Sequence, residues 1–253
     1  ERIDFSSDTG TLPTKGPLSA GRYLTSETGN QSYGYWAGGG TPSVVSTVDR
    51  IDYGNDSATA TPKGPLSTAR YGLAATGNAD YGYFGGGGSG YVSTVDRIDY
   101  SNDTATALVR GPLSDGRRMF LGTGTLSYGY MGGGTSPATV STVDRIDYTN
   151  DTATTVAKGP LSVARYSAGA TGNATFGYWG GGKDSPEYST VDRLDYSSDT
   201  TACVAKGPLS VGRSTTGATG NIHYGWWGGG QIGPGPLTTI VDRLDYSSDT
   251  TTC

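Results

Sequence analysis

Short stretches in which apolar residues alternate with polar or small ones, separated by turn-forming residues, make up the whole chain. In one such unit, a run of small and apolar residues at 70–76 precedes Gly77-Asn78 and then Tyr81-Gly-Tyr-Phe. Alternation along a strand places Tyr81 and Tyr83 on one face. Gly-Asn between two such runs is a hairpin signal, because both residues tolerate positive φ. The pattern therefore predicts two antiparallel strands joined by a tight turn.

The same unit continues with two further predicted strands. The segment 93–100 (Ser-Thr-Val-Asp-Arg-Ile-Asp-Tyr) alternates as a third strand, and 101–103 (Ser-Asn-Asp) is typical of a turn. The Thr- and Val-containing segment 104–109 favours a fourth strand, which the Gly-Pro of 111–114 ends. No stretch has a helical period.

This unit is repeated along the chain at a nearly constant interval. The Arg-Ile/Leu-Asp-aromatic phrase recurs with spacings of 48, 47, 48, 48 and 50 residues. A period of about 40–50 residues in a strand-rich chain indicates a radial or stacked repeat, and four short strands per unit are typical of a propeller blade. We therefore predict an all-β, five-bladed β-propeller of four-stranded antiparallel blades that forms one domain over 1–253. The six phrases begin at Arg2, Arg50, Arg97, Arg145, Arg193 and Arg243.

The two ends of the chain carry parts of a sixth repeat. The N-terminal segment 9–15 is predicted to supply the fourth strand of the last blade and so to close the ring. Third strands outnumber blades by one, so either 2–5 or 242–246 has no obvious place in a sheet. Fraying at one end is the interpretation we favour. Excision from a longer array is the alternative, because the first residue is Glu1 rather than Met.

The order of motifs resembles the kelch repeat. In one unit, the loop 161–165 ends in Arg165, the second strand ends in Tyr178-Trp-Gly-Gly-Gly, and the third strand is Val191-Asp-Arg-Leu-Asp-Tyr. The resemblance covers the chain five times and implies a propeller whose loops before the first strand and after the second lie on one face. One departure is the missing Trp at the start of the fourth strand. The bulky residue stands in the second strand instead, as Trp36, Phe84, Met131, Trp179 and Trp227. The repeats are also similar in style to propeller repeats of marine phage virion proteins.

Composition and charge exclude several classes of function. The net charge is −5 and cations are spread evenly, whereas nucleic-acid binding needs clustered Lys and Arg. No hydrophobic run is long enough to span a membrane. The single histidine, His223, rules out a His-based triad or a His-rich metal site, so we expect no cofactor, no metal and no catalytic residue. Cys203 and Cys253 occupy equivalent places in successive repeats and are expected to be small core residues rather than a disulfide.

Candidate ligand contacts lie on the predicted loop face. One arginine per repeat precedes the first strand, and repetition favours a structural role in these loops over a ring of cationic donors for an acidic or glycan ligand. The loops after the glycines differ in charge, length and aromatic content, which is where a rigid scaffold accumulates binding diversity. The arginines are Arg22, Arg70, Arg117, Arg165 and Arg213, and the loop candidates are Tyr91, Lys183, Asp184, Glu187 and Tyr188.

The sequence thus predicts a non-enzymatic binding or interaction scaffold for a protein or glycan ligand, within a virion or extracellular assembly. One alternative is a multivalent lectin with one shallow pocket per repeat, which would gain affinity through avidity. A purely structural domain of a larger assembly is a second alternative, and an enzyme ranks last.

Overall fold

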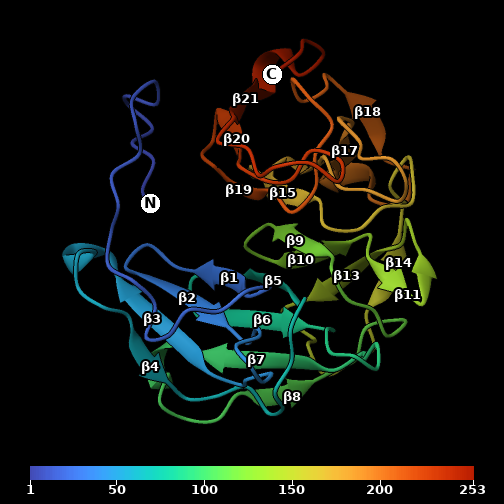
Figure 1. Ribbon diagram of the computed structural model, residues 1–253. Helices are drawn as coiled ribbons and strands as arrows, with labels where there is room; N and C mark the ends of the chain where they lie inside the picture. The colour runs from blue at the N-terminus through green and yellow to red at the C-terminus, as the bar shows by residue number, and fades with distance from the viewer.

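The computed structural model describes residues 1–253 as a ring of five antiparallel β-sheets (Figure 1), which confirms the predicted five-bladed propeller. Blades 1 to 4 have four strands each, and blade 5 has three. The innermost strands are β1 (Ser26–Gly29), β5 (Ala74–Gly77), β9 (Leu121–Gly124), β15 (Gly169–Gly172) and β19 (Gly217–Gly220). The second strands are β2 (Tyr33–Ala37), β6 (Tyr81–Gly85), β10 (Tyr128–Gly132), β16 (Phe176–Gly180) and β20 (Tyr224–Gly228).

The outer part of each blade follows the same plan. The third strands are β3 (Val48–Asp52), β7 (Val95–Asp99), β13 (Val143–Asp147), β17 (Val191–Asp195) and β21 (Val241–Asp245). The fourth strands are β4 (Thr61–Lys63), β8 (Leu108–Arg110), β14 (Val156–Lys158) and β18 (Val204–Lys206). Single 3-10 turns follow four third strands, at η1 (Tyr53–Asn55), η2 (Tyr100–Asn102), η3 (Tyr196–Ser198) and η4 (Tyr246–Ser248). A two-residue ladder, β11 (Thr135–Ser136) with β12 (Ala138–Thr139), lies in a loop of blade 3.

The fourth strands are shorter than the sequence predicts. In blade 2 the expected strand at 104–109 is reduced to β8, because the residues before it contact the preceding blade instead of β7. The Ala107 amide donates to the carbonyl of Pro65 at 2.9 Å, and the Gly64 amide donates to the carbonyl of Asp103 at 2.8 Å. These bonds join the outer edge of each blade to the next.

The core consists of interfaces between blades rather than one central cluster. In blades 3 to 5 the bulky residue of the second strand packs on a glycine of the preceding blade, where a side chain would collide. A Cβ on Gly180 would lie 2.6 Å from Nε1 of Trp227, and one on Gly132 would lie 2.8 Å from Nε1 of Trp179. Both tryptophans are fully buried. These glycines therefore allow blades 2 to 5 to approach one another closely.

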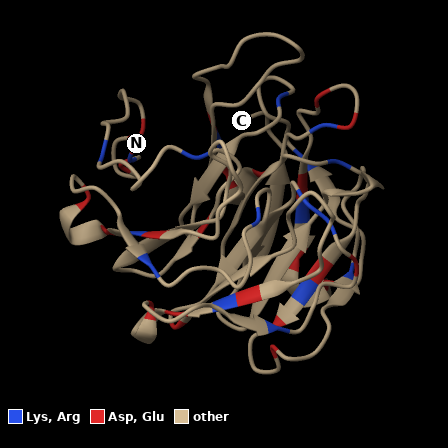
Figure 2. Cartoon of the chain, turned by 60° about the horizontal axis from the view of Figure 1, so that its bottom comes forward, with Lys and Arg blue, Asp and Glu red and all other residues tan.

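One aspartate from each of blades 2 to 5 crosses to the blade before it. Oδ2 of Asp199, in the turn after β17 of blade 4, accepts hydrogen bonds from the Tyr130 hydroxyl at 2.9 Å and from Nη1 of Arg145 at 2.7 Å. Its Oδ1 lies 3.1 Å from Nζ of Lys158. Asp103, Asp151 and Asp249 make the corresponding contacts in their own interfaces. The arginine of the repeated phrase thus forms an inter-blade ion pair with the turn aspartate of the next blade, whereas the aspartates of the phrase bind within their own blade. Basic and acidic positions lie close together along the blades (Figure 2).

The N-terminal segment does not supply the fourth strand of blade 5 that the sequence predicted. It stands in the opening between blade 1 and blade 5 (Figure 1), and no strand is formed at 9–15. Phe5 stacks on Trp226 of blade 5 at 4.7 Å between ring centroids. Asp8 accepts from Nε1 of Trp226 at 2.8 Å, and Arg2 pairs with Asp56 of blade 1 at 2.9 Å. Of the two competing segments, 242–246 lies in β21 and the 3-10 turn after it, and 2–5 stays outside the sheets.

Removing one crossing aspartate is expected to destabilise the ring. Asp199→Ala leaves two cations and a tyrosine hydroxyl without their acceptor, and breaking a buried pair in this way costs about 3–5 kcal/mol. Chemical denaturation measures the loss. Asp184→Ala, at an exposed aspartate, serves as the control and should change stability by no more than about 0.5 kcal/mol. Equal effects of the two substitutions would contradict the structural role of Asp199.

Acid should weaken the same contact. Burial opposes ionisation of Asp199, but the hydrogen bonds from Tyr130 and Lys158 and the charge of Arg145 outweigh it and lower its pKa below the ordinary 3.8. The folded state therefore binds fewer protons, so the stability from this group is present above pH 3.8 and is lost as the pH falls through the lower folded pKa. Denaturation curves of Asp199→Asn should show a smaller acid dependence than those of the parent chain.

Candidate binding faces

The propeller presents two different faces. On the loop face, the residue after each loop arginine pairs with the variable loop of the same blade, for example Tyr166 with Lys183 and Ser214 with Gln231. On the hairpin face, the turns between first and second strands of blades 1 to 4 surround the centre of the ring; three of them are Gly-Asn turns and that of blade 3 is Gly-Thr. The expected grouping of arginine loops and variable loops on one face is therefore correct.

The loop arginines lie beneath the loop face rather than on it. Nη2 of Arg165 binds Oδ2 of Asp192 at 2.8 Å and the carbonyl of Trp179 at 2.9 Å, and both charged side chains are fully buried. The Ser162 amide also donates to Asp192 at 2.9 Å, which fixes the loop to the third strand. Burial lowers the pKa of Arg165, and the charge of Asp192 opposes that shift. The other four pairs are Arg22–Asp49, Arg70–Asp96, Arg117–Asp144 and Arg213–Asp242.

The variable-loop candidates lie nearer the surface. Asp184 is exposed and accepts a hydrogen bond from Thr139 of blade 3 at 2.8 Å, while Glu187 and Tyr188 are half-buried. Lys183 lies over the ring of Tyr166 at 5.7 Å. These four candidates share one loop.

Tyr91 belongs to a separate cluster on the loop face, at the junction of blades 2 and 3. It adopts a positive φ of 53°, and the guanidinium of Arg118 lies 4.9 Å from its ring centroid. Arg118 also donates to the hydroxyl of Tyr71 at 2.7 Å. Tyr91 is thus placed away from the other four candidates, and Arg118 and Tyr71 join it without having been singled out in the sequence.

Apolar side chains are exposed in the two loops that flank the ring opening. Leu237 of the blade 5 loop is 82% exposed, and Val44 of the blade 1 loop is 42% exposed. Tyr23, just after the first loop arginine, is 62% exposed. Together with the charges of the blade 4 loop, they give the loop face a mixed apolar and charged surface.

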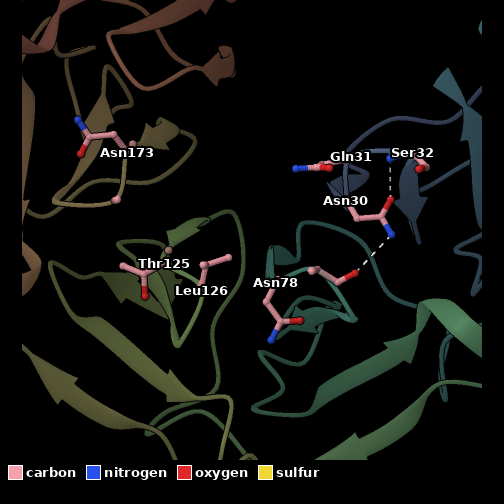
Figure 3. A pocket seen from close by; sticks show the side chains of 13 residues that line it. Asn30, Gln31, Ser32, Asn78, Thr125, Leu126 and Asn173 are labelled. Atoms are coloured by element: carbon pink, nitrogen blue, oxygen red, sulfur yellow. Dashed lines mark hydrogen bonds between the residues drawn. The ribbon is translucent and has the colours of Figure 1, made fainter. Parts of the chain in front are cut away.

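The hairpin face holds a cavity of about 700 Å³ at the centre of the ring (Figure 3). The turns of blades 1 to 4 line it. Oδ1 of Asn173 accepts from the amides of Thr175 and Phe176, and Oδ1 of Asn78 accepts from two amides of its own turn in the same way. The asparagine oxygens are therefore used by the fold. The sequence predicted these turns but not that they line one cavity. The turns come together only once the blades are arranged around the ring.

Glu27 is the exception among the innermost strands. Blades 2, 4 and 5 have Ala75, Ala170 and Ala218 at the corresponding position, and blade 3 has Gly122. The carboxyl group is accessible to solvent but surrounded by protein, and this partial desolvation raises its pKa above the ordinary 4.5. A single acidic residue at this point distinguishes blade 1 from the others.

Groups that carry hydrolytic or metal chemistry are dispersed. His223 lies in the exposed turn before β20, with its amide donating to Oδ1 of Asn221. No three His, Cys, Asp or Glu side chains converge as a metal site. Cys203 and Cys253 are free, as expected. No helix in the structure has the length and hydrophobicity that crossing a membrane requires.

Comparison with known proteins adds no family assignment. No family model matches the chain, and no curated protein matches it either. The five-bladed propeller therefore stands on the sheet topology and on the contacts between blades.

Replacing a loop arginine is expected to unfold the loop face rather than to remove a ligand contact alone. Arg165→Ala leaves Asp192 buried without a counter-ion and should cost about 3–5 kcal/mol in the free energy of unfolding. The double substitution Arg165→Met/Asp192→Leu removes both charges and should recover much of that loss. A single variant with unchanged stability would contradict the structural role and favour the cationic-donor interpretation.

Proposed function

We propose that this protein is a non-enzymatic binding scaffold that recognises a macromolecular partner through its loop face. One observation carries the proposal: five loops of different sequence stand on a frame fixed by five buried Arg–Asp pairs. Loops on a rigid frame lose little entropy on binding. The β-propeller is also commonly a protein-binding scaffold, and the kelch-like order of motifs supports that use.

A protein partner suits the chemistry of the loop face. Specific protein interfaces combine an apolar centre with a polar rim and are enriched in Tyr and Arg. Leu237 and Tyr23 supply exposed apolar area, Arg118 and Tyr91 form a stacked pair, and Asp184 contributes charge. Location in a virion or extracellular assembly is part of the proposal, and its support is the similarity of the repeats to virion propellers.

A lectin with one pocket per repeat remains the second candidate. It needs a free aromatic face in each repeat, since sugars stack on such faces. The first aromatic residue of each second strand is instead covered by an arginine of the third strand, for example Arg97 over Tyr81 at 4.2 Å and Arg145 over Tyr128 at 4.5 Å. This covering favours the loop face over repeated pockets.

Two equally exposed leucines on opposite faces provide a matched test. A displayed random-peptide library is selected on the parent protein, and the selected peptides are measured against Leu237→Asp and Leu126→Asp. Leu237 lies on the loop face and is 82% exposed, and Leu126 lies on the hairpin face and is 80% exposed. We expect Leu237→Asp to weaken binding by at least about tenfold, or roughly 1.4 kcal/mol, and Leu126→Asp to leave it unchanged.

The opposite result would contradict the proposal. Peptides that lose affinity only with Leu126→Asp would place recognition at the central cavity of the hairpin face. A glycan array on the same protein tests the second candidate, because a hit with a stoichiometry near five would make the protein a lectin. Both variants must keep the unfolding midpoint of the parent, which thermal denaturation checks.

A further inference from the structure

Blade 1 and blade 5 each present a sheet face that no other blade covers. Each innermost strand packs beside the innermost strand of the next blade from β1 through β5, β9 and β15 to β19, and the series stops there (Figure 1). We call the space between these two faces the open sector. A site in the open sector is separate from the loop face of the proposed function, because the sector lies within the ring itself.

The N-terminal segment already fills the outer half of this sector in the manner of a blade. Asp8 contacts Trp226 and Arg243 of blade 5, as Asp249 contacts Tyr178 and Arg193 of blade 4. Phe5 stacks on Trp226 at 4.7 Å, as Tyr246 stacks on Tyr178 at 4.8 Å.

The other side of the segment repeats the contacts of a blade with its successor. Asp56 of blade 1 binds Arg2 and Lys15, as Asp103 binds Arg50 and Lys63. Residues 2–15 therefore occupy the places of a third strand, its turn and a fourth strand. A first and a second strand are what this sector lacks.

The face of blade 5 toward the open sector shows where those strands would lie. Val241 is 42% exposed, whereas the same residue of blade 4, Val191, is fully buried. Gly217 has nothing within 4 Å of its Cβ direction, although Gly169 in blade 4 is crowded there by Trp227 and Thr216 of the next blade. Thr219 is exposed, and its counterpart Thr171 is buried against Tyr246.

The face of blade 1 is incomplete in the complementary way. Trp36 is half-buried, whereas Trp179 and Trp227 at the same position are fully buried. The indole N–H of Trp179 donates to the carbonyl of Leu121 in the blade before it, at 3.1 Å, and that of Trp227 donates to Gly169 at 3.1 Å. Trp36 has no such acceptor. The indole N–H of Trp36 thus lacks the acceptor that the first strand of a preceding blade supplies to Trp179 and Trp227.

We propose that the open sector is a docking site for one further hairpin of the repeat's own type. Such a hairpin consists of a first strand, a Gly-Asn turn and a second strand, like residues 70–87. Its first strand offers the acceptor for Trp36, and its second strand places an aromatic residue over Gly228, which only Val241 approaches, at 3.7 Å. A second copy of the folded chain is a poor occupant, because its own second strands are already paired on both sides.

Glu27 is expected to oppose docking of the hairpin. It lies beside Trp36 in the register of β1 with β2, on the face that meets the hairpin. A docked strand removes water from the carboxylate without supplying a counter-ion, and that desolvation is unfavourable. Glu27→Ala restores the residue found in blades 2, 4 and 5 and should therefore strengthen docking.

The experiment uses the full chain extended after Cys253 by a copy of residues 61–88. This copy continues the repeat in register, since Thr61 follows Ala60 as Val204 follows Cys203, and it contains no tryptophan. Trp36 is the one tryptophan that is not buried, so its emission reports occupancy. We expect the extension to shift tryptophan emission to shorter wavelength and to raise the thermal midpoint. Trp36→Phe should abolish the spectral difference.

The matched control carries the same extension with Ala75→Pro and Tyr83→Pro in the appended copy, which prevents either strand from pairing. Equal emission and equal midpoints for the two extended chains would overturn the proposal. A shift to shorter wavelength in the unextended chain as its concentration rises would also overturn it, because the occupant would then be a second copy.

Glu27→Ala should raise the midpoint of the extended chain by more than Glu187→Ala does. If Glu27→Ala lowers that midpoint, the carboxylate anchors an occupant of another kind and the proposed hairpin is wrong.

Discussion

The ring depends on one repeated contact, in which an aspartate carboxylate of one blade binds side chains of the blade before it. Four aspartates in the turns after third strands bind a tyrosine and two cations of the preceding blade, and Asp8 makes a related contact with Trp226 and Arg243. Small, glycine-rich sheets bury little apolar area each, so directional ion pairs supply the specificity of stacking. The tyrosine pairs stacked above these aspartates, such as Tyr130 with Tyr196 at 4.8 Å, add apolar contact to each interface.

A second set of buried ion pairs acts within each blade and determines how the loop face can be used. Each loop arginine is bound to the aspartate that opens the Asp-Arg-Ile/Leu-Asp part of the third strand, and in every blade it also donates to a backbone carbonyl. The charge of each loop arginine is therefore neutralised by a buried aspartate beneath the loop face. The sequence varies instead in the loops above these arginines, where Leu237, Asp184 and Tyr91 differ from their counterparts in other blades. A fixed frame and variable loops suit recognition of a partner.

Much of this fold could be predicted from the sequence, because periodic spacing reports local structure and repetition. The second strands, the Gly-Asn turns and the role of glycine beneath Trp179 and Trp227 follow from residue type alone. The shortness of β8 could not be predicted, because it results from hydrogen bonds to the preceding blade. The central cavity and the half-buried state of Trp36 also depend on how the blades are arranged around the ring, which no local pattern encodes.

A double-mutant cycle between Arg145 and Asp199 tests the central claim most directly. The cycle compares unfolding free energies of the parent chain, Arg145→Ala, Asp199→Ala and the double variant. These two residues come from adjacent blades and lie 2.7 Å apart, so a contact that holds the ring together should give a coupling energy of at least about 1.5 kcal/mol. Additive effects, with a coupling near zero, would contradict the account and show that the apolar interfaces alone determine how the blades stack.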